Sequence, residues 1–423
     1  MPVSLASAVD RCLVAPGSDS ERYLMLTLEA SGGPTPRLPL NLALAIDTSG
    51  SMAGEKLHRA QEAASQVVRH LTAADRVAVV SYSDGVRIVA PSTELTPSAK
   101  TDLLWRFGRM EAGGMTNLSG GWLTACQGVA KHQRGEEQVN RVLLLTDGLA
   151  NVGITDLDDL IEHARQLRLR GVTTSTMGVG VDFNEELLEA MARHGGGRFQ
   201  YVETAKHIPD CVGGELGELL EIAARNVAVE VGLPERVTCA GCLNEYLLED
   251  TPQGVRVHLG DLLAGASKRA VLKLRVLDQG GDAPLRIGGL ALYTDTHTGR
   301  GTDQKLPEVE LHPSDPAAVQ VQVPDPDVEH EVMLLLAARA KDEAVRLSRL
   351  GEDAAAASAL SAASRALGMS AYSADATISR EISALMSLAQ DAGQGLREHQ
   401  RKELRYQAYL SREARGRYDP PQG

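Results

Sequence analysis

An acidic residue and two serines stand close together, directly after an apolar stretch of the sequence. Asp47, Ser49 and Ser51 follow residues 42–46, a short apolar run that is typical of a buried parallel strand. One carboxylate and two hydroxyl groups are hard oxygen donors, which suit a hard divalent cation. The sequence therefore predicts the beginning of a cation-binding loop.

The elements that must hold this loop lie on either side of it. Residues 56–71 carry apolar side chains at the spacing of one helical face, so a helix follows the loop. The polar residues then stand between the carboxyl end of a strand and the start of a helix. This is the position at which open α/β sheets bind ligands.

Two later segments complete a recognisable pattern. Thr116 lies in the glycine-rich stretch 113–117, and Asp147 follows the apolar run 142–145 and precedes a glycine. Together with Asp47, Ser49 and Ser51 these residues resemble the von Willebrand factor type A (VWA) family and its metal-ion-dependent adhesion site. The family pattern is Asp-x-Ser-x-Ser, a distant Thr and a distant Asp before Gly, and all five positions match. The resemblance covers roughly residues 40–217.

The resemblance implies a set of metal ligands. The hydroxyl groups of Ser49, Ser51 and Thr116 would bind the metal, and Asp47 and Asp147 would bind it directly or through water. Mg²⁺ is the expected ion, with Mn²⁺ or Ca²⁺ as alternatives, because Mg²⁺ takes six oxygen ligands and readily keeps waters. Without a cation, the two carboxylates would face each other, which favours protonation or displacement of one of them.

The expected function is binding. The loops supply too few strong donors to close an octahedral shell, so one position stays open to water or to an outside carboxylate. In this family an Asp or Glu of a protein partner typically fills that position, which makes the chain a metal-dependent interaction module or adaptor. Intracellular bacterial VWA proteins of this layout resemble partners of AAA+ ATPases or parts of multi-protein assemblies.

Other readings of the motif remain open. Ser, Thr and Asp also cap helices and stabilise turns, so the site could be degenerate. Asn117 and Glu55 could support the ligands, although cap or turn roles are the simpler expectation for both. A metal-dependent, phosphatase-like hydrolase acting on a small substrate is the alternative function. Catalysis is not expected, because a haloacid-dehalogenase phosphatase needs a second carboxylate where Ser49 stands, and no GxxxxGK[ST] loop occurs.

Composition narrows the class of partner. The 423 residues carry a net charge of -13 and only 3% aromatic residues, which argues against nucleic-acid binding. No apolar run approaches the ~20 residues of a membrane span. Residues 1–20 lack the long apolar core of a secretory signal. We therefore expect a soluble, cytoplasmic protein with no membrane span.

The cysteines predict no disulfide framework. Their number, five, is odd, and the chain is long. Cys239 and Cys242 form a CxxC pair with no second pair at zinc-finger spacing. We expect ordinary reduced thiols at both positions.

Residue patterns divide the chain into regions. Strands and helices alternate in residues 38–224, which predicts an α/β fold with a doubly wound, mostly parallel sheet of the VWA or Rossmann-like kind. Residues 225–324 mostly alternate apolar and polar side chains, which indicates a β-sandwich. Residues 325–418 are predicted to form a helical bundle. Residues 1–37 contain a strand that we expect to join the sandwich, which would make the VWA domain an insertion.

Two local interpretations follow from the same patterns. Residues 319–323 alternate Val and Gln and are predicted to form a strand. The last predicted helix, residues 396–412, is rich in basic residues offset by glutamates. A solvated helix face is expected there, with a docking surface for an acidic partner as the alternative.

Overall fold

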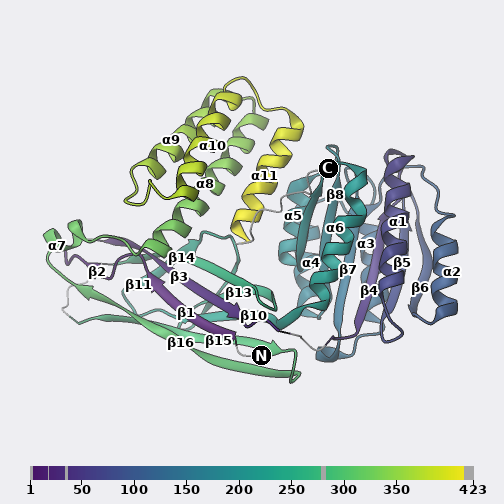
Figure 1. The fold of residues 1–423 in the computed structure, drawn as a ribbon, viewed down its shortest axis with the longest axis horizontal. Coiled ribbons are helices and arrows are strands. Elements are labelled where there is room, and N and C mark those ends of the chain that lie inside the picture. The colour runs from purple at the N-terminus through teal and green to yellow at the C-terminus, as the bar shows by residue number, and fades with distance from the viewer. Residues whose placement is uncertain (1–2, 18, 34–36, 278–282, 414–423) are drawn as a thin grey trace. The chain divides into compact units, whose positions relative to one another are not determined.

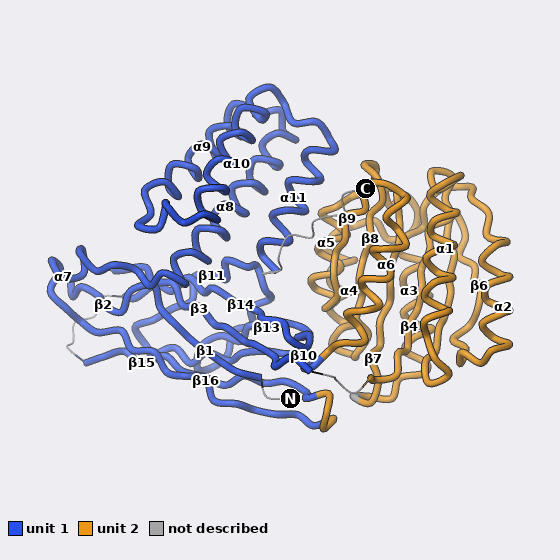
Figure 2. The backbone as a smooth tube through the Cα atoms, viewed as in Figure 1, with its two compact units in different colours: residues 1–33, 223–295, 300–423 blue, residues 34–222, 296–299 orange. Residues whose placement is uncertain are grey.

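The computed structural model describes residues 3–17, 19–33, 37–277 and 283–413. The chain divides into two compact units (Figure 2). Unit 1 comprises residues 1–33, 223–295 and 300–423, and unit 2 comprises residues 34–222 and 296–299. Each unit is described by itself.

Unit 2 is built on a six-stranded sheet in the order β6-β5-β4-β7-β8-β9 (Figure 1). Its strands are β4 (Leu40–Asp47), β5 (Arg76–Tyr82), β6 (Val86–Glu94), β7 (Val139–Thr146), β8 (Thr173–Val179) and β9 (Gly196–Val202). All neighbours are parallel except β6, which runs antiparallel to β5. The two central strands are buried along their whole length, which explains why they read as continuous apolar runs.

Helices alternate with these strands. They are α1 (Glu55–His70), α2 (Pro97–Phe107), α3 (Leu118–Ala130), α4 (Leu157–Leu169), α5 (Glu185–His194) and α6 (Ile208–Leu220), with short 3₁₀ turns η1 (Gly50–Met52), η2 (Gly135–Glu137) and η3 (Ala205–His207). Ala60 and Ala64 of α1 and Val212 of α6 pack on the central strands. On α3, Trp122 is fully buried and donates to the Thr174 hydroxyl. The predicted doubly wound α/β fold is confirmed.

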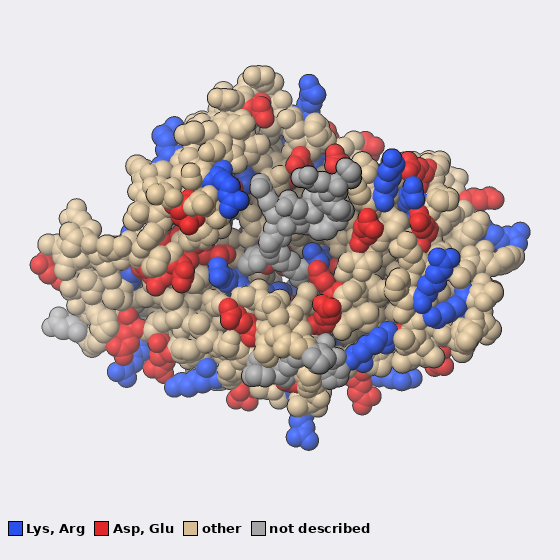
Figure 3. All heavy atoms as spheres, viewed as in Figure 1, with Lys and Arg blue, Asp and Glu red and all other residues tan. Residues whose placement is uncertain are grey.

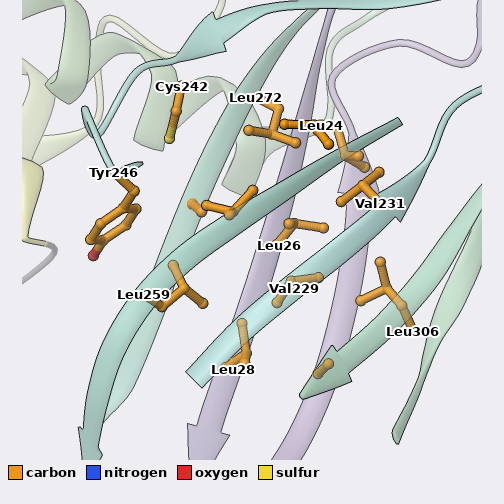
Figure 4. Packing of buried hydrophobic residues seen from close by; sticks show 14 of the residues in the cluster. Leu24, Leu26, Leu28, Val229, Val231, Cys242, Tyr246, Leu259, Leu272 and Leu306 are labelled. Carbon is orange, nitrogen blue, oxygen red and sulfur yellow. The ribbon is translucent and has the colours of Figure 1, made fainter. Parts of the chain in front are cut away.

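Unit 1 contains two further sheets. The four-stranded sheet has the order β1-β3-β14-β11, with β1 (Val3–Val9), β3 (Ser20–Ala30), β14 (Ser267–Val276) and β11 (Val237–Cys242). The six-stranded sheet has the order β12-β13-β10-β15-β16-β2, with β12 (Leu247–Thr251), β13 (Gly254–Leu263), β10 (Ile222–Gly232), β15 (Leu285–Asp295), β16 (Arg300–Pro313) and β2 (Leu13–Val14). One apolar core joins both sheets, and Figure 4 shows Leu26 and Leu272 of the first sheet beside Val229 and Leu259 of the second.

Helices complete unit 1. They are α7 (Pro316–Val321), α8 (Pro326–Arg349), α9 (Asp353–Gly368), α10 (Ala376–Ala392) and α11 (Glu398–Arg412). The last four share an apolar core that includes Leu360, Leu385 and Leu404. Val328 and Val332 of α8 pack in a second cluster with side chains of the four-stranded sheet. Among the described residues, no helix is long and apolar enough to cross a membrane.

One local prediction was wrong and another was wrong in part. Residues 319–323 do not form a strand: residues 316–321 form α7, because the Asp315 side chain accepts from the Ala317 N–H and Pro316 suits the first helical turn. The face of α11 is only partly solvated, since Lys402 and Arg412 are buried. Their charges are matched by carboxylates, with Glu398 3.9 Å from Lys402 and Asp342 bonded to Arg412.

Charged side chains of both signs are interspersed over the molecular face drawn in Figure 3. The basic helix α11 pairs part of its charge with carboxylates of the same unit. These ion pairs weaken the attraction of α11 for polyanions, and the negative net charge of the whole chain acts in the same direction.

The core of unit 1 yields a stability prediction. Leu26 is fully buried on β3, between both sheets. Leu26→Ala should lower the free energy of unfolding by about 2–5 kcal/mol, because it removes buried methyl groups and leaves a cavity. Leu290→Ala on β15, where the side chain is 38% exposed, is the matched control and should have a much smaller effect. Urea unfolding followed by circular dichroism measures both, and equal effects would contradict the described core.

Candidate metal centre

The register of two parallel strands brings the acidic residues together. Ile46 on β4 pairs with Leu145 on β7, so both strands end at the same edge of the sheet. Asp47 is the last residue of β4, and Asp147 directly follows β7. Both carboxylates are fully buried. The structure therefore places two acidic groups side by side in an environment that does not favour charge.

Asp47 is held at both of its oxygens. Its Oδ1 accepts from the Ser49 N–H at 2.8 Å, and its Oδ2 accepts from the Thr146 hydroxyl at 2.6 Å. Burial raises the pKa of Asp47 above its usual value, and these hydrogen bonds only partly offset that effect, while the neighbouring Asp147 adds to the rise. Asp47 thus carries an unfavourable charge that a bound cation would stabilise.

The hydroxyl groups connect the two acids. Ser51 Oγ donates to Asp147 Oδ1 at 2.7 Å and lies 3.1 Å from Ser49 Oγ. Both serine hydroxyl groups therefore lie beside the two carboxylates. Thr116 reaches the same point, since a Cβ added to Gly148 would lie 3.5 Å from Thr116 Oγ1 and 3.6 Å from Ser51 Oγ. All five predicted residues therefore surround one point.

Backbone contacts position the Thr116 loop against the Asp47 loop. Gly50 N–H donates to the Gly114 carbonyl at 3.0 Å, and Gly113 N–H donates to the Thr48 carbonyl at 2.8 Å. Gly114 has φ +80°, and a Cβ there would lie 2.3 Å from Asp84 Oδ2. Only glycine meets both constraints, which accounts for Gly114 in the glycine-rich stretch.

Two supporting residues escaped sequence reasoning. Asp84 Oδ1 accepts from the Met115 N–H at 2.7 Å, and Asn151 Oδ1 accepts from the Thr116 N–H at 2.9 Å. The pair Asp84-Gly85 is a turn signal after an apolar strand, and it could have drawn attention to Asp84. Nothing in the local sequence links Asn151 to Thr116.

Lys56 is the most consequential residue that the sequence analysis missed. Its Nζ forms an ion pair with Asp147 Oδ2, so the chain supplies a positive charge of its own beside the two acids. Lys56 lies in the first turn of α1, where the helix dipole disfavours a cation. A lysine at that position needs a nearby anion, and this mismatch is the signal that could have identified it.

The expected secondary roles are also settled by the contacts. Asn117 is the N-cap of α3 and accepts from the Gly120 N–H at 3.0 Å. Glu55 lies 3.6 Å from Arg59 on the same helix. Asn117 therefore has the expected cap role, whereas Glu55 lies in the first turn of α1 and pairs with Arg59 instead of capping the helix.

The donor set fits a hard divalent cation. Asp47, Asp147, Ser49, Ser51 and Thr116 provide only oxygen atoms, and hard cations prefer oxygen. No group of three or more His, Cys, Asp or Glu side chains that could hold a metal occurs within the described residues. A cation at this edge would therefore rely on two carboxylates and neutral hydroxyls. Such a set leaves room for water or an outside ligand.

A parallel sheet with helices on its faces, and an Asp-x-Ser-x-Ser loop joined by Thr116 and Asp147 at its carboxyl edge, define a VWA-type domain. Residues 41–213 match the family model of the von Willebrand factor type A domain, so the chain carries a VWA domain in unit 2. The recognition made from the motif is confirmed at this level.

The chain is also similar to curated relatives and to solved structures, and the similar structures cover nearly all of it. The chain is 32% identical over 221 residues to the uncharacterized protein YfbK of Escherichia coli (strain K12), a match that covers 51% of this chain and 38% of the relative. The structure of a von Willebrand factor type A protein from Catenulispora acidiphila aligns with a TM-score of 0.73 and 17% identity, over 97% of this chain and 96% of that one. The ArnB paralog VWA2 from Sulfolobus acidocaldarius aligns with a TM-score of 0.65 and 15% identity, over 97% and 98%. At these identities the structures show a shared fold.

The ion pair of Lys56 yields a prediction for the metal-free chain. Lys56→Met removes the charge partner of the buried Asp147 and should lower the free energy of unfolding in EDTA by about 1–3 kcal/mol. Added Mg²⁺ should recover more stability in the variant than in the wild type, because the cation replaces the missing charge. Thermal unfolding with and without Mg²⁺ measures both effects. Identical behaviour of variant and wild type would contradict the role given to Lys56.

Proposed function

We propose that unit 2 binds a divalent cation at Asp47, Ser49, Ser51, Thr116 and Asp147, and that an acidic residue of a protein partner completes the site. The observation that carries this proposal is the convergence of five oxygen-bearing side chains on one buried edge. Four of the five residues are buried, whereas Ser51 is exposed to solvent. A cation held there would be reachable from outside.

Charge favours an anionic outside ligand. Asp47 and Asp147 together balance a divalent cation, and Lys56 adds one further positive charge. The occupied site would then carry a net positive charge in a poorly solvated position. A partner's carboxylate would neutralise it, and the cation would bridge acidic groups that repel each other in its absence.

Mg²⁺ is the ion that this donor set suits best, with Mn²⁺ and Ca²⁺ as alternatives. Mg²⁺ needs six oxygen ligands in near-octahedral geometry and keeps waters readily. Its role is to present an open coordination position. The protein's own residues orient the ligands: Thr146 and the Ser49 N–H hold Asp47, and Lys56 and Ser51 hold Asp147.

The environment of Asp47 argues against the hydrolase alternative. A phosphatase of the haloacid-dehalogenase kind uses an aspartate after a strand as its nucleophile and a second carboxylate two residues further on. Here Ser49 stands at the position of that second carboxylate. A binding role fits this difference, so we infer that the chain is not an enzyme.

The VWA layout supports an adaptor that joins a larger assembly in the cytoplasm, with an AAA+ ATPase or a multi-protein complex as partner. The rest of the chain would then act as scaffold or as a second interface. The match to YfbK spans less than half of that relative, so this assignment is a proposal for the whole chain.

Metal binding is tested by thermal stability. Mg²⁺ or Mn²⁺ at about 100 times its dissociation constant should stabilise the folded chain by about 2.7 kcal/mol. In a domain of 150–250 residues each kcal/mol raises the melting temperature by about 2–4 °C. Asp47→Asn should abolish the rise while keeping the fold in EDTA, because the amide preserves the shape and can still accept from the Ser49 N–H. Asp102→Asn on the surface of α2 is the control that should retain the rise.

The adaptor role is tested by affinity purification with wild type and Asp47→Asn, each with and without EDTA. A partner at the metal site should be lost in the variant and in EDTA. The purified chain is assayed in parallel for phosphatase and ATPase activity with Mg²⁺ and Mn²⁺. Turnover that requires metal and disappears in Asp47→Asn would overturn the adaptor proposal in favour of the hydrolase.

A further inference from the structure

Large apolar side chains are exposed on three loops at the same edge of the sheet as the candidate metal centre. Met115 is 55% exposed, Leu149 is 56% exposed and Val181 is 39% exposed. They belong to the loop before α3, the loop after β7 and the loop after β8. No two of them are close in sequence, so the fold brings them to this edge.

Each of these residues directly neighbours a group that contacts the site. Met115 precedes the ligand Thr116, and its own N–H is held by Asp84. Leu149 follows Gly148, whose Cβ position lies 3.5 Å from Thr116 Oγ1. Val181 follows Gly180, whose Cβ position lies 3.9 Å from Lys56 Nζ. The three loops beside the polar centre thus each carry an exposed apolar side chain, and we call Met115, Leu149 and Val181 the apolar rim.

Other exposed apolar side chains of unit 2 are found on elements of the sheet and its helices, and they include Val86 and Ile88 on β6. Trp105 lies on α2 with the Arg109 guanidinium 4.4 Å from its ring, and Leu169 ends α4 near the start of β8. Single exposed apolar residues of this kind are ordinary on protein surfaces. Apolar side chains that surround a charged centre are typical of interfaces, where they exclude water from a polar contact at the middle.

We propose that the rim selects the partner: the acidic side chain that reaches the metal centre is flanked on its own chain by large apolar residues. This inference rests on the proposed function, because the central contact is the bridge between cation and carboxylate. The rim adds a requirement for the partner's residues on either side of that carboxylate. Leu, Ile, Met or Phe beside the acid would cover Met115, Leu149 and Val181.

The same contact explains why flanking apolar groups matter. Lys56 places a fixed positive charge at the centre, and water screens its attraction for a carboxylate. Apolar contact around the centre removes that water, so the carboxylate interacts more strongly with both Lys56 and the cation. A partner with polar residues beside its acid would leave water around the rim, and its central carboxylate would contribute less to the binding free energy.

Synthetic peptides test the proposal on the full chain in millimolar Mg²⁺. Both series have a central Glu, flanked on each side by Leu and Phe in one series and by Ser in the other. Fluorescence anisotropy should show about tenfold tighter binding of the apolar series, equivalent to about 1.4 kcal/mol. Replacing the central Glu by Gln, or adding EDTA, should abolish binding of both series.

Variants assign the preference to the rim. The combined variant Met115→Ser, Leu149→Ser and Val181→Ser should lose the preference while keeping its Mg²⁺-induced rise in melting temperature, which shows that fold and metal site are intact. Leu169→Ser is the matched control, because that leucine is 67% exposed on the same unit but away from this edge, and it should keep the preference.

The outcomes separate the two proposals. Binding that needs Glu and Mg²⁺ but is equal in both peptide series overturns the rim proposal and leaves the proposed function standing. A preference that survives in the rim variant also overturns it. Binding that persists in EDTA or with Gln, or no binding of either series, overturns the proposed function and the rim proposal with it.

Discussion

Two carboxylates buried at one edge of a parallel sheet are the interaction on which the rest of unit 2 depends. Burying an unpaired charge costs far more than a single hydrogen bond returns, so every neighbouring group must help to satisfy it. Asp47 uses a backbone N–H and Thr146, and Asp147 uses Ser51 and Lys56. The glycine-rich loop, the first turn of α1 and the register of β4 against β7 all serve this arrangement.

The sequence predicted the parts of this arrangement that are local. The place of the Asp-x-Ser-x-Ser loop could be predicted from the sequence, because the strand before it and the helix after it are contiguous with it in the chain. The contact of Lys56 with Asp147 spans 91 positions and depends on where β7 ends, so the place of Lys56 in its helix could suggest a nearby anion but not which one. The support of Met115 by Asp84 depends in the same way on the pairing of β5 with the centre of the sheet.

Unit 1 shows the same division between local and distant information. Alternating side chains indicate strands, yet the pairing of Leu26 on β3 with Ala270 on β14 joins residues that are far apart in the chain. Two local signals conflict near residues 319–323. Their alternation of apolar and polar side chains favours a strand, but the helix cap formed by Asp315 and the following proline favours a helix, and a helix forms. Burial of Lys402 could not be predicted from its charge alone, because its side chain is buried in the fold while Glu398 lies 3.9 Å from its ammonium group.

Under the proposed function, the Lys56 ammonium beside the candidate ligands would couple the binding of metal and partner. In the metal-free chain Lys56 already compensates Asp147, which weakens the drive to bind a divalent ion. With an ion bound, the same ammonium would leave the centre positive and would strengthen the drive to bind an anion. A partner's carboxylate would then raise the affinity for the metal, and by thermodynamic reciprocity the metal would raise the affinity for the partner by the same factor. A lysine in place of a neutral residue thus favours the fully assembled state over the state with metal alone.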